Sequence, residues 1–272
     1  MKNERSLWPL LLAALLISAS LAIPAVAQES EEPENTEEPE GRAPAVWNLD
    51  LALSVTHTTG NTESDSGSVG LSYKTEWGDW AFTADVNAIK VDTTSGPQSE
   101  KVTTTERYTA DIAIDRKFSE HWSLSVIDAY YRDPFAGIDL RYALQVGARY
   151  QRQVSEKWST EWLLGGGYEI EELIDGSDSE HSVARLDFNN EWKLKGDATF
   201  SQKLGATGNL DDTEDFRVVF HLGVTAPLTD LLALKLAYDM KYENQPVLSA
   251  EDLDTTLLAS VVLTLKSKET EK

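Results

Sequence analysis

The sequence of 272 residues contains no cysteine. This absence excludes a disulfide framework, a thiolate metal site and an anchor attached through a lipidated cysteine. Basic residues are scarce as well, because 24 Lys and Arg stand against 46 Asp and Glu and give a net charge of −22. Nucleic-acid binding requires a basic surface, so we do not expect nucleic acid among the partners.

Long apolar runs are absent except at the N-terminus, where residues 7–23 follow the basic Lys2 and Arg5 and precede Ala25-Val26-Ala27. A short apolar run before a small-x-small site is typical of a cleaved export signal, so we predict that residues 1–27 are removed. A retained anchor is the alternative. The remaining chain then has a net charge of −22 − (+1) = −23 and no run that is long enough for a transmembrane helix.

Residues 28–45 hold seven glutamates and three prolines but almost no apolar side chain. Such a segment cannot bury a core, and we predict a disordered acidic leader. At the other end, residues 267–272 form a short charged tail. The folded domain is therefore expected to span residues 46–266.

Helical periodicity is lacking in that domain, and a period of two replaces it. In residues 140–150 one face is apolar, whereas the other carries Arg141, Gln145 and Arg149 among small residues. The same alternation recurs in about twelve segments, joined by tight turns on one side and by longer acidic loops, such as 92–101 and 171–181, on the other. This pattern predicts an all-β fold, an antiparallel up-and-down transmembrane β-barrel of about 12 strands. Asp128 interrupts an apolar face, where we predict a bulge.

Tryptophans gather at one end of the predicted strands. Those at the tight-turn end are Trp47, Trp77, Trp80, Trp122, Trp158 and Trp192, and only Trp162 lies inside a strand. Because amphipathic rings collect at a membrane–water boundary, this placement favours lipid outside the barrel. Alternation alone does not say which face points inward, so a soluble barrel with an apolar core remains the alternative.

Three motifs carry a resemblance to a known family. They are Trp47-x-Leu49-x-Leu51 followed by Thr59-Gly60-Asn61-Thr62, then Phe118-Ser119-Glu120-His121-Trp122, and Tyr131-Arg132-Asp133-x-Phe135-x-Gly137-Ile138-Asp139-x-Arg141. Over residues 47–265 the chain resembles the YdiY-like, salt-induced outer-membrane protein family, a domain of unknown function in Gram-negative bacteria. The resemblance implies an exported outer-membrane barrel without catalytic residues. The chain departs from such barrels because its last strand reaches Leu265 and a charged tail, not a terminal aromatic residue that the assembly machinery reads.

Catalytic and metal-binding signatures are missing. The histidines at 57, 121, 181 and 221 have no metal-ligand spacing, and no Gly-x-Ser-x-Gly motif occurs. Gly165-Gly166-Gly167 is not followed by Lys-Ser/Thr, so close strand packing explains it better than phosphate binding. We therefore predict no enzyme activity, no cofactor and no metal site. An outer-membrane lipid hydrolase with a Ser–His pair on its outer wall is an alternative.

Charged side chains on the predicted inner faces are the candidates for function. The selected residues are Arg132, Asp133 and Asp139 at the mouth, and Arg141, Arg149, Arg185, Asp187, Arg217 and His221 in the lumen. Charges of both signs can pair across a narrow lumen and fill it, or they can line a channel for small solutes. We favour the filled lumen, and with it a structural or stress-related barrel whose partners are outer-membrane lipid, lipopolysaccharide and the barrel-assembly machinery.

Overall fold

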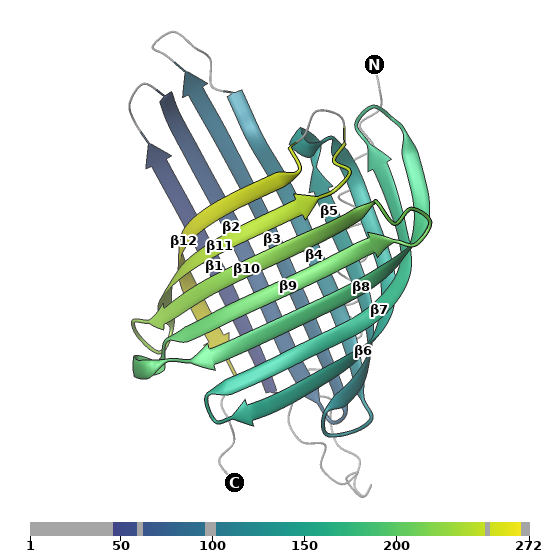
Figure 1. The fold of residues 1–272 in the computed structure, drawn as a ribbon. Coiled ribbons are helices and arrows are strands. Elements are labelled where there is room, and N and C mark those ends of the chain that lie inside the picture. The colour runs from purple at the N-terminus through teal and green to yellow at the C-terminus, as the bar shows by residue number, and fades with distance from the viewer. Residues whose placement is uncertain (1–45, 59–61, 96–101, 248–250, 268–272) are drawn as a thin grey trace, which may run out of the picture. The chain divides into compact units, whose positions relative to one another are not determined.

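The computed structural model describes residues 46–58, 62–95, 102–247 and 251–267, which all belong to the compact unit Ala43–Lys272. The predicted export signal, the acidic leader and residues 268–272 lie outside this part. Within it, the chain forms one closed antiparallel barrel in which each strand pairs with its neighbours in sequence and β1 pairs with β12 (Figure 1). The strands are β1 (Val46–Thr58), β2 (Thr62–Trp77), β3 (Trp80–Ser95), β4 (Val102–Lys117), β5 (Trp122–Asp133), β6 (Ile138–Ser155), β7 (Trp158–Leu173), β8 (Asp178–Lys193), β9 (Thr199–Asn209), β10 (Phe216–Pro227), β11 (Leu232–Glu243) and β12 (Leu253–Lys266).

The predicted twelve-stranded barrel is thus confirmed, but its connections differ from the prediction. The expected acidic loop at 171–181 is largely strand, because β7 continues to Leu173 and β8 begins at Asp178. Likewise β3 extends to Ser95 into the expected loop at 92–101. Strand pairing uses backbone groups, so it continues into acidic sequence wherever water can solvate the side chains. We call the end with the β2–β3 turn the turn end, and the opposite end the loop end.

The described part of the chain has two short 3-10 turns, η1 (Pro134–Ala136) and η2 (Lys195–Asp197). Among the described residues, no helix has the length and apolarity needed to cross a membrane.

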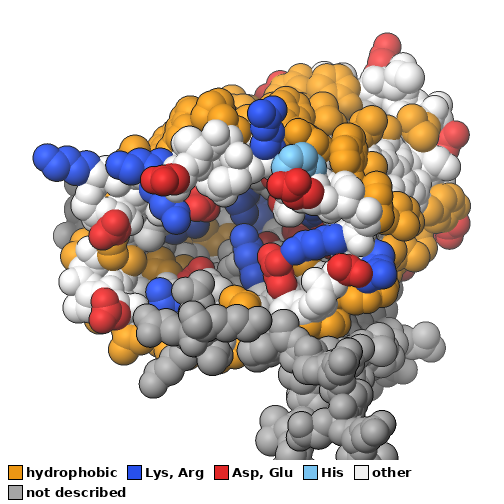
Figure 2. Space-filling view, turned by 90° about the horizontal axis from the view of Figure 1, so that it is seen from below, with side chains coloured by type: hydrophobic (Ala, Val, Ile, Leu, Met, Phe, Trp, Pro, Cys, Tyr) orange, Lys and Arg blue, Asp and Glu red, His pale blue; other side chains and the backbone are white. Residues whose placement is uncertain are grey.

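Apolar side chains face outward along the strands. Leu164 is 68% exposed and Leu236 is 54% exposed, although each lies in the middle of a paired strand. Figure 2, a view from the turn end, shows hydrophobic side chains around the perimeter and charged side chains of both signs around the central hollow. The alternative of a soluble barrel with an apolar core is therefore wrong, since the apolar face of the strands is the outer one.

Aromatic side chains mark both ends of this apolar surface. At the turn end, the Trp158 and Trp192 rings lie 5.8 Å apart, and the Arg116 guanidinium stands 5.1 Å from the Trp80 ring centre. Toward the loop end, tyrosines predominate, and their hydroxyl groups bind outward-facing carboxylates: Tyr108 donates to Glu106, Tyr142 to Asp128 and Tyr168 to Glu180. Rings that have one polar edge suit two membrane–water boundaries.

Asp128 does face outward, but the bulge predicted there is wrong. β5 keeps a regular register through Asp128, which accepts a hydrogen bond of 3.1 Å from the Tyr142 hydroxyl group on the neighbouring strand. The irregularity lies further along, between Tyr131 and Asp133. A cross-strand partner, not a change of backbone, therefore accommodates the carboxylate.

The seam between β1 and β12 is paired along only part of its length. Asn48–Leu53 pair with Val261–Lys266, and beyond them the described residues of β1 have no backbone pairing to β12. The Ser54 hydroxyl group ends the ladder by donating a 2.7 Å hydrogen bond to the Ala259 carbonyl. Figure 1 shows the two strands diverging toward the loop end. Val55 and Leu257, which flank the divergence, are 86% and 70% exposed.

Glycines let β6 and β7 approach closely, as the sequence analysis proposed for Gly165-Gly166-Gly167. A Cβ on Gly167 would stand 2.0 Å from the Leu144 carbonyl oxygen, and one on Gly165 would stand 2.6 Å from the Val146 oxygen. Both obstacles are backbone atoms of a paired strand, which cannot move away without breaking the ladder. Gly167 is therefore a position where a side chain conflicts with barrel closure.

We expect Gly167→Ala to destabilise the folded barrel by about 1–3 kcal/mol, the usual range for overpacking. The measurement is the temperature at which the compact, fast-migrating form converts to the unfolded form in a gel. The matched control is Gly208→Ala, whose new Cβ would meet only the Phe216 side chain at 3.9 Å. Equal transition temperatures for the two variants would contradict the close-approach explanation.

Candidate functional site in the lumen

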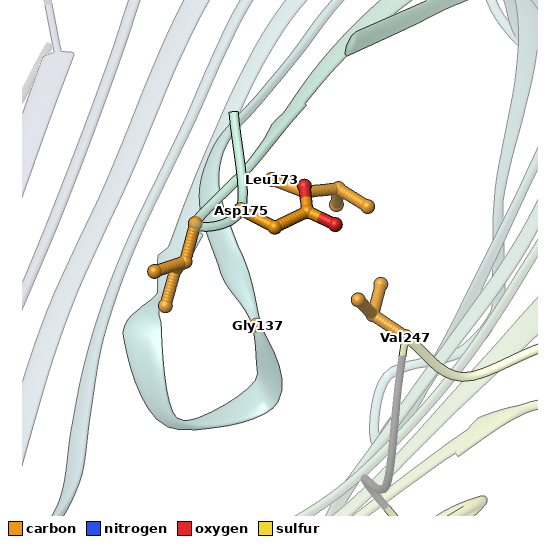
Figure 3. A pocket seen from close by; sticks show the side chains of 5 residues that line it. Gly137, Leu173, Asp175 and Val247 are labelled. Carbon is orange, nitrogen blue, oxygen red and sulfur yellow. The ribbon is translucent and has the colours of Figure 1, made fainter. Parts of the chain in front are cut away.

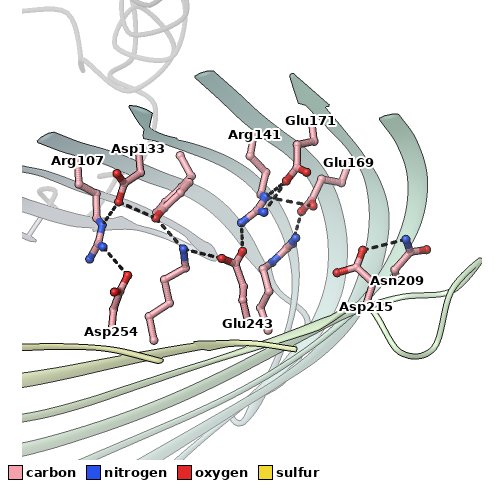
Figure 4. A network of polar contacts seen from close by, with 12 residues as sticks. Arg107, Asp133, Arg141, Glu169, Glu171, Asn209, Asp215, Glu243 and Asp254 are labelled. Atoms are coloured by element: carbon pink, nitrogen blue, oxygen red, sulfur yellow. Dashed lines mark hydrogen bonds and ion pairs between the residues drawn. The ribbon is translucent and has the colours of Figure 1, made fainter. Parts of the chain in front are cut away.

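A belt of charged side chains crosses the lumen near the loop end (Figure 4). We call it the outer belt. Its members come from β4 to β8 on one wall and from β10 to β12 on the other. They are Arg107, Tyr131, Asp133, Arg141, Glu169, Glu171, His181, Arg217, Lys241, Glu243 and Asp254.

One end of the belt is built on Arg107 of β4. Its Nε donates to Asp133 of β5 at 2.8 Å, and its Nη2 donates to Asp254 of β12 at 3.0 Å. β4 and β12 are not neighbours in the sheet, since β1, β2 and β3 stand between them. The Arg107–Asp254 ion pair is therefore a contact across the lumen, not along its wall.

Arg141 of β6 forms the centre of the belt. Its Nη1 lies 2.7 Å from Glu243 on β11, its Nε donates to Glu171 on β7 at 2.5 Å, and Glu169 lies 3.7 Å away. The Arg141 and Glu243 side chains are only 11% and 10% exposed. One guanidinium thus holds three carboxylates from two opposite walls.

Lys241 and Arg217 extend the belt on either side of this centre. The Lys241 ammonium donates to the Tyr131 hydroxyl group at 2.7 Å and lies 3.1 Å from Glu243. Arg217 of β10 donates to Glu169 of β7 at 2.6 Å. Because a buried charge is stable only when it is paired and hydrogen-bonded, these contacts make the belt a single cooperative unit.

His181 is the least satisfied member of the belt. Its Nε2 lies 3.4 Å from Glu169 Oε1, and among the described residues neither atom has a hydrogen-bond partner. The contact becomes an ion pair when the imidazole is protonated. Four Arg and Lys face five carboxylates in the outer belt, so one further proton there would balance the charge.

Loop-end segments cover the belt from outside. Gly137 of the β5–β6 connection, Leu173, Ile174 and Asp175 at the end of β7, and Val247 after β11 line a pocket of about 250 Å³ (Figure 3). The Ile174 N–H donates to the Gly137 carbonyl at 3.0 Å. Gly137 has φ +84°, and a Cβ there would stand 2.9 Å from Val247 Cγ1. Val247 therefore packs against a position that only glycine fits.

The three residues predicted at the mouth take different places. Asp133 turns inward, where its side chain is 3% exposed and also accepts hydrogen bonds from the Phe135 and Ala136 N–H groups. Arg132 and Asp139 instead pair on the outer face at 3.1 Å, with Glu106 at 3.8 Å from Arg132. Arg132 and Asp133 keep the alternation of β5, whereas an extra residue on β6 between Ile138 and Arg141 places Asp139 on the outer face, and the sequence pattern did not predict it.

Between the outer belt and the turn end, the lumen is also lined by polar side chains, but these are more exposed to solvent. We call this part, which opens at the turn end, the inner chamber. Asp111 and Asp239 have side chains that are 50% and 43% exposed, far more than Arg141 and Glu243 at the centre of the outer belt, which are 11% and 10% exposed. Val219, which shares the inward face of β10 with Arg217 and His221, is 51% exposed. The chamber wall leaves room for water that the belt does not.

The other predicted lumen residues lie in the wall of this chamber. Arg149 binds Asp115 at 3.0 Å and also Glu161. Arg185 donates to Asp187 at 2.7 Å and to Gln145 at 2.9 Å. Most of these contacts join nearby strands and stiffen the wall, but the Arg185 guanidinium on β8 also lies 3.8 Å from Asp111 on β4.

The outer belt is completed by Tyr131, Glu243 and Asp254, which were not among the mouth and lumen residues predicted from the sequence. Alternation along β11 places Glu243 on the polar face of the strand, and this position was the sequence signal that its side chain faces the lumen. Nothing in the sequence indicated that β11 and β12 would meet β4, β5 and β6 across the lumen. Among the described residues, no group of three or more His, Asp or Glu is arranged to hold a metal ion.

Comparison with known proteins gives a family and several similar folds. No curated protein matches the sequence significantly. The NanC porin has a TM-score of 0.49 and 12% identity, with 79% of this chain and 98% of that chain covered. An outer-membrane channel from Pseudomonas putida F1 has a TM-score of 0.47 and 13% identity, with 85% and 100% covered. The KdgM porin in complex with disordered oligogalacturonate has a TM-score of 0.41 and 7% identity, with 81% and 98% covered.

These structures are similar to the chain in fold, as outer-membrane β-barrels. The model of one protein family, described as "Protein of unknown function, DUF481", matches residues 51–265, which include every strand of the barrel at least in part. The chain, a twelve-stranded β-barrel, belongs to the DUF481 family, whose function is unknown.

Proposed function

We propose that the protein is an occluded outer-membrane barrel, closed to solutes at its loop end and open as a water-filled chamber at its turn end. The observation that carries this proposal is the outer belt, whose side chains from opposite walls meet in ion pairs. Its central members Arg141, Glu169 and Glu243 are between 3% and 11% exposed. Side chains that exclude water from one another leave no path for a hydrated ion.

Export by the predicted signal and insertion with the turn end toward the periplasm are part of this proposal, because short turns face that side in bacterial barrels. The apolar outer surface then contacts outer-membrane lipid and lipopolysaccharide, and the barrel-assembly machinery inserts the chain. A structural or salt-stress role, as the resemblance to the YdiY-like family implies, suits a barrel that does not leak.

A narrow channel for small solutes is the second candidate. The exposed Asp111 and Asp239 of the inner chamber favour it, because half of the lumen already holds water beside charged groups. Conversion to a channel would require only that the belt open. Conductance separates the two candidates.

We expect the purified protein to give no steady conductance steps in a planar bilayer. Arg141→Ala should produce steps, because it removes the guanidinium that spans the lumen between β6 and β11. The matched control is Arg116→Ala, an outward-facing arginine over Trp80 at the turn end, which should stay silent. Steady steps from the unmodified protein, equal to those of Arg141→Ala, would support the channel.

The belt should also show strong energetic coupling. Arg141→Met alone strands buried carboxylates and should destabilise the barrel by about 3–5 kcal/mol, whereas Arg141→Met with Glu243→Met should cost less than the sum of the single changes. Urea unfolding in detergent micelles measures this cycle. The Arg132–Asp139 pair, 30% and 46% exposed, is the control and should couple by less than about 1 kcal/mol. Similar coupling in both pairs would speak against a sealed belt.

A further inference from the structure

A serine, a histidine and a carboxylate converge inside the barrel, in the wall of the inner chamber. Ser201 lies on β9, His221 on β10 and Asp239 on β11, three consecutive strands. His221 is directly opposite Asp239 in the ladder, and Ser201 is opposite Gly223, two residues beyond His221 on the same inward face. Cross-strand and diagonal neighbours on one face are within reach of each other.

The carboxylate orients the imidazole ring. Asp239 Oδ1 lies 2.5 Å from His221 Nδ1. An ionised carboxylate only accepts hydrogen bonds, so Nδ1 carries the proton and the neutral ring presents Nε2 as an acceptor. This is the arrangement that a general base requires from its orienting group.

The missing side chain of Gly223 lets the serine and the base come close to each other. A Cβ on Gly223 would stand 2.7 Å from Ser201 Oγ and 3.0 Å from His221 Nε2. The two atoms are therefore no further apart than the sum of these distances, 5.7 Å. Ser201 Oγ now donates a long hydrogen bond of 3.5 Å to the Gly223 carbonyl. Rotation about its χ1 turns it toward Nε2, and such contacts commonly tighten only when substrate binds.

A cation completes the cluster. Lys235 Cε lies 3.5 Å from the same Gly223 Cβ position. Its side chain therefore reaches the same part of the chamber wall as Ser201 Oγ and His221 Nε2. A positive charge held there stabilises the oxyanion of a tetrahedral intermediate. The site is open to the inner chamber, because the His221 and Asp239 side chains are 21% and 43% exposed.

We propose that Ser201, His221 and Asp239 form a hydrolytic site for small carboxylic esters, with Lys235 as the oxyanion partner. The narrow lumen favours a small ester over a folded or extended polypeptide. This assignment departs from the sequence-based expectation of no catalytic residue. It also differs from the lipid hydrolase considered there, whose pair would stand on the outer wall.

The reaction balances with water as the only co-reactant. His221 Nε2 takes the Ser201 hydroxyl proton while Oγ bonds to the ester carbonyl carbon, and the carbonyl π pair moves to the oxygen beside Lys235. The intermediate collapses, the C–O bond to the alcohol breaks, and the alcohol leaves with the proton from Nε2. Water, deprotonated by His221, then attacks the acyl-serine, and the acid and the Ser201 hydroxyl group are released.

The test uses the full folded chain in detergent micelles, a fluorophosphonate probe and p-nitrophenyl acetate. We expect the probe to label Ser201, as located by peptide mass spectrometry, and Ser201→Ala to abolish that label. His221→Asn should slow labelling and ester hydrolysis by about 100-fold or more, the range for loss of a general base. Gly223→Ala should also slow both, because its methyl group would stand 2.7 Å from Ser201 Oγ and 3.0 Å from His221 Nε2 and would force the two side chains apart.

Ser68→Ala, at an inward-facing serine of β2 that pairs with Ser54 and Ile89, is the matched control and should label and hydrolyse normally. Heat-modifiable gel migration checks that each variant folds. No label on Ser201, or labelling that is equally fast in His221→Asn, would overturn the site. Neither result depends on conductance, so the proposal of an occluded barrel is tested separately.

Discussion

Hydrogen bonding of the backbone is the constraint on which the rest of this structure depends. In a bilayer an unpaired N–H or C=O costs several kcal/mol, and a closed ring of strands satisfies all of them without regard to side chains. Because backbone pairing does not depend on the side chains, acidic stretches such as 171–173 and 178–181 are part of β7 and β8, beyond the apolar surface. It also explains where closure is weakest, since at the β1–β12 seam a side chain, Ser54, makes the last hydrogen bond in place of the backbone.

Closure has a consequence for charge. Every second residue of each strand must enter a confined lumen, and in this chain many of those residues are ionised. Removing a charged group from water costs several kcal/mol per ion. An opposite charge and hydrogen bonds are needed to offset this desolvation penalty. Arg141, placed between Glu171 on its own wall and Glu243 on the opposite one, meets this demand by crossing the lumen. The outer belt is therefore both what the lumen charges require and what closes the passage.

Much of the fold could be predicted from the sequence, because strand alternation is a local signal. The period of two over residues 140–150 identified which face of β6 is apolar, and the clustered tryptophans indicated that this face is the outer one. Loop lengths were predicted poorly, since acidic residues indicate exposure to water but not the end of strand pairing. Asp139 was predicted at the mouth with Arg132, but the irregularity of β6 between Ile138 and Leu140, which turns Asp139 outward, depends on pairing with the neighbouring strands.

The candidate site was harder to predict for a related reason. The belt contact between Arg107 and Asp254 joins residues 147 apart in sequence on strands that are not neighbours. No local pattern encodes it, because it depends on how the closed barrel brings opposite walls together. The alternation along each strand indicated only that most of the belt residues point inward. Partners across the lumen required the three-dimensional arrangement.

The two parts of the lumen show that the same kind of residue does different things according to how much water reaches it. In the belt, Glu243 is 10% exposed and is held by Arg141 and Lys241, so its charge serves the closed structure. In the inner chamber, Asp239 is 43% exposed and has an imidazole as its partner. Paired strands hold such a side chain in fixed register with its neighbours, which is the pre-organisation that catalysis needs. A glycine in the middle of that register, Gly223, lets the Ser201 and His221 side chains come close to each other.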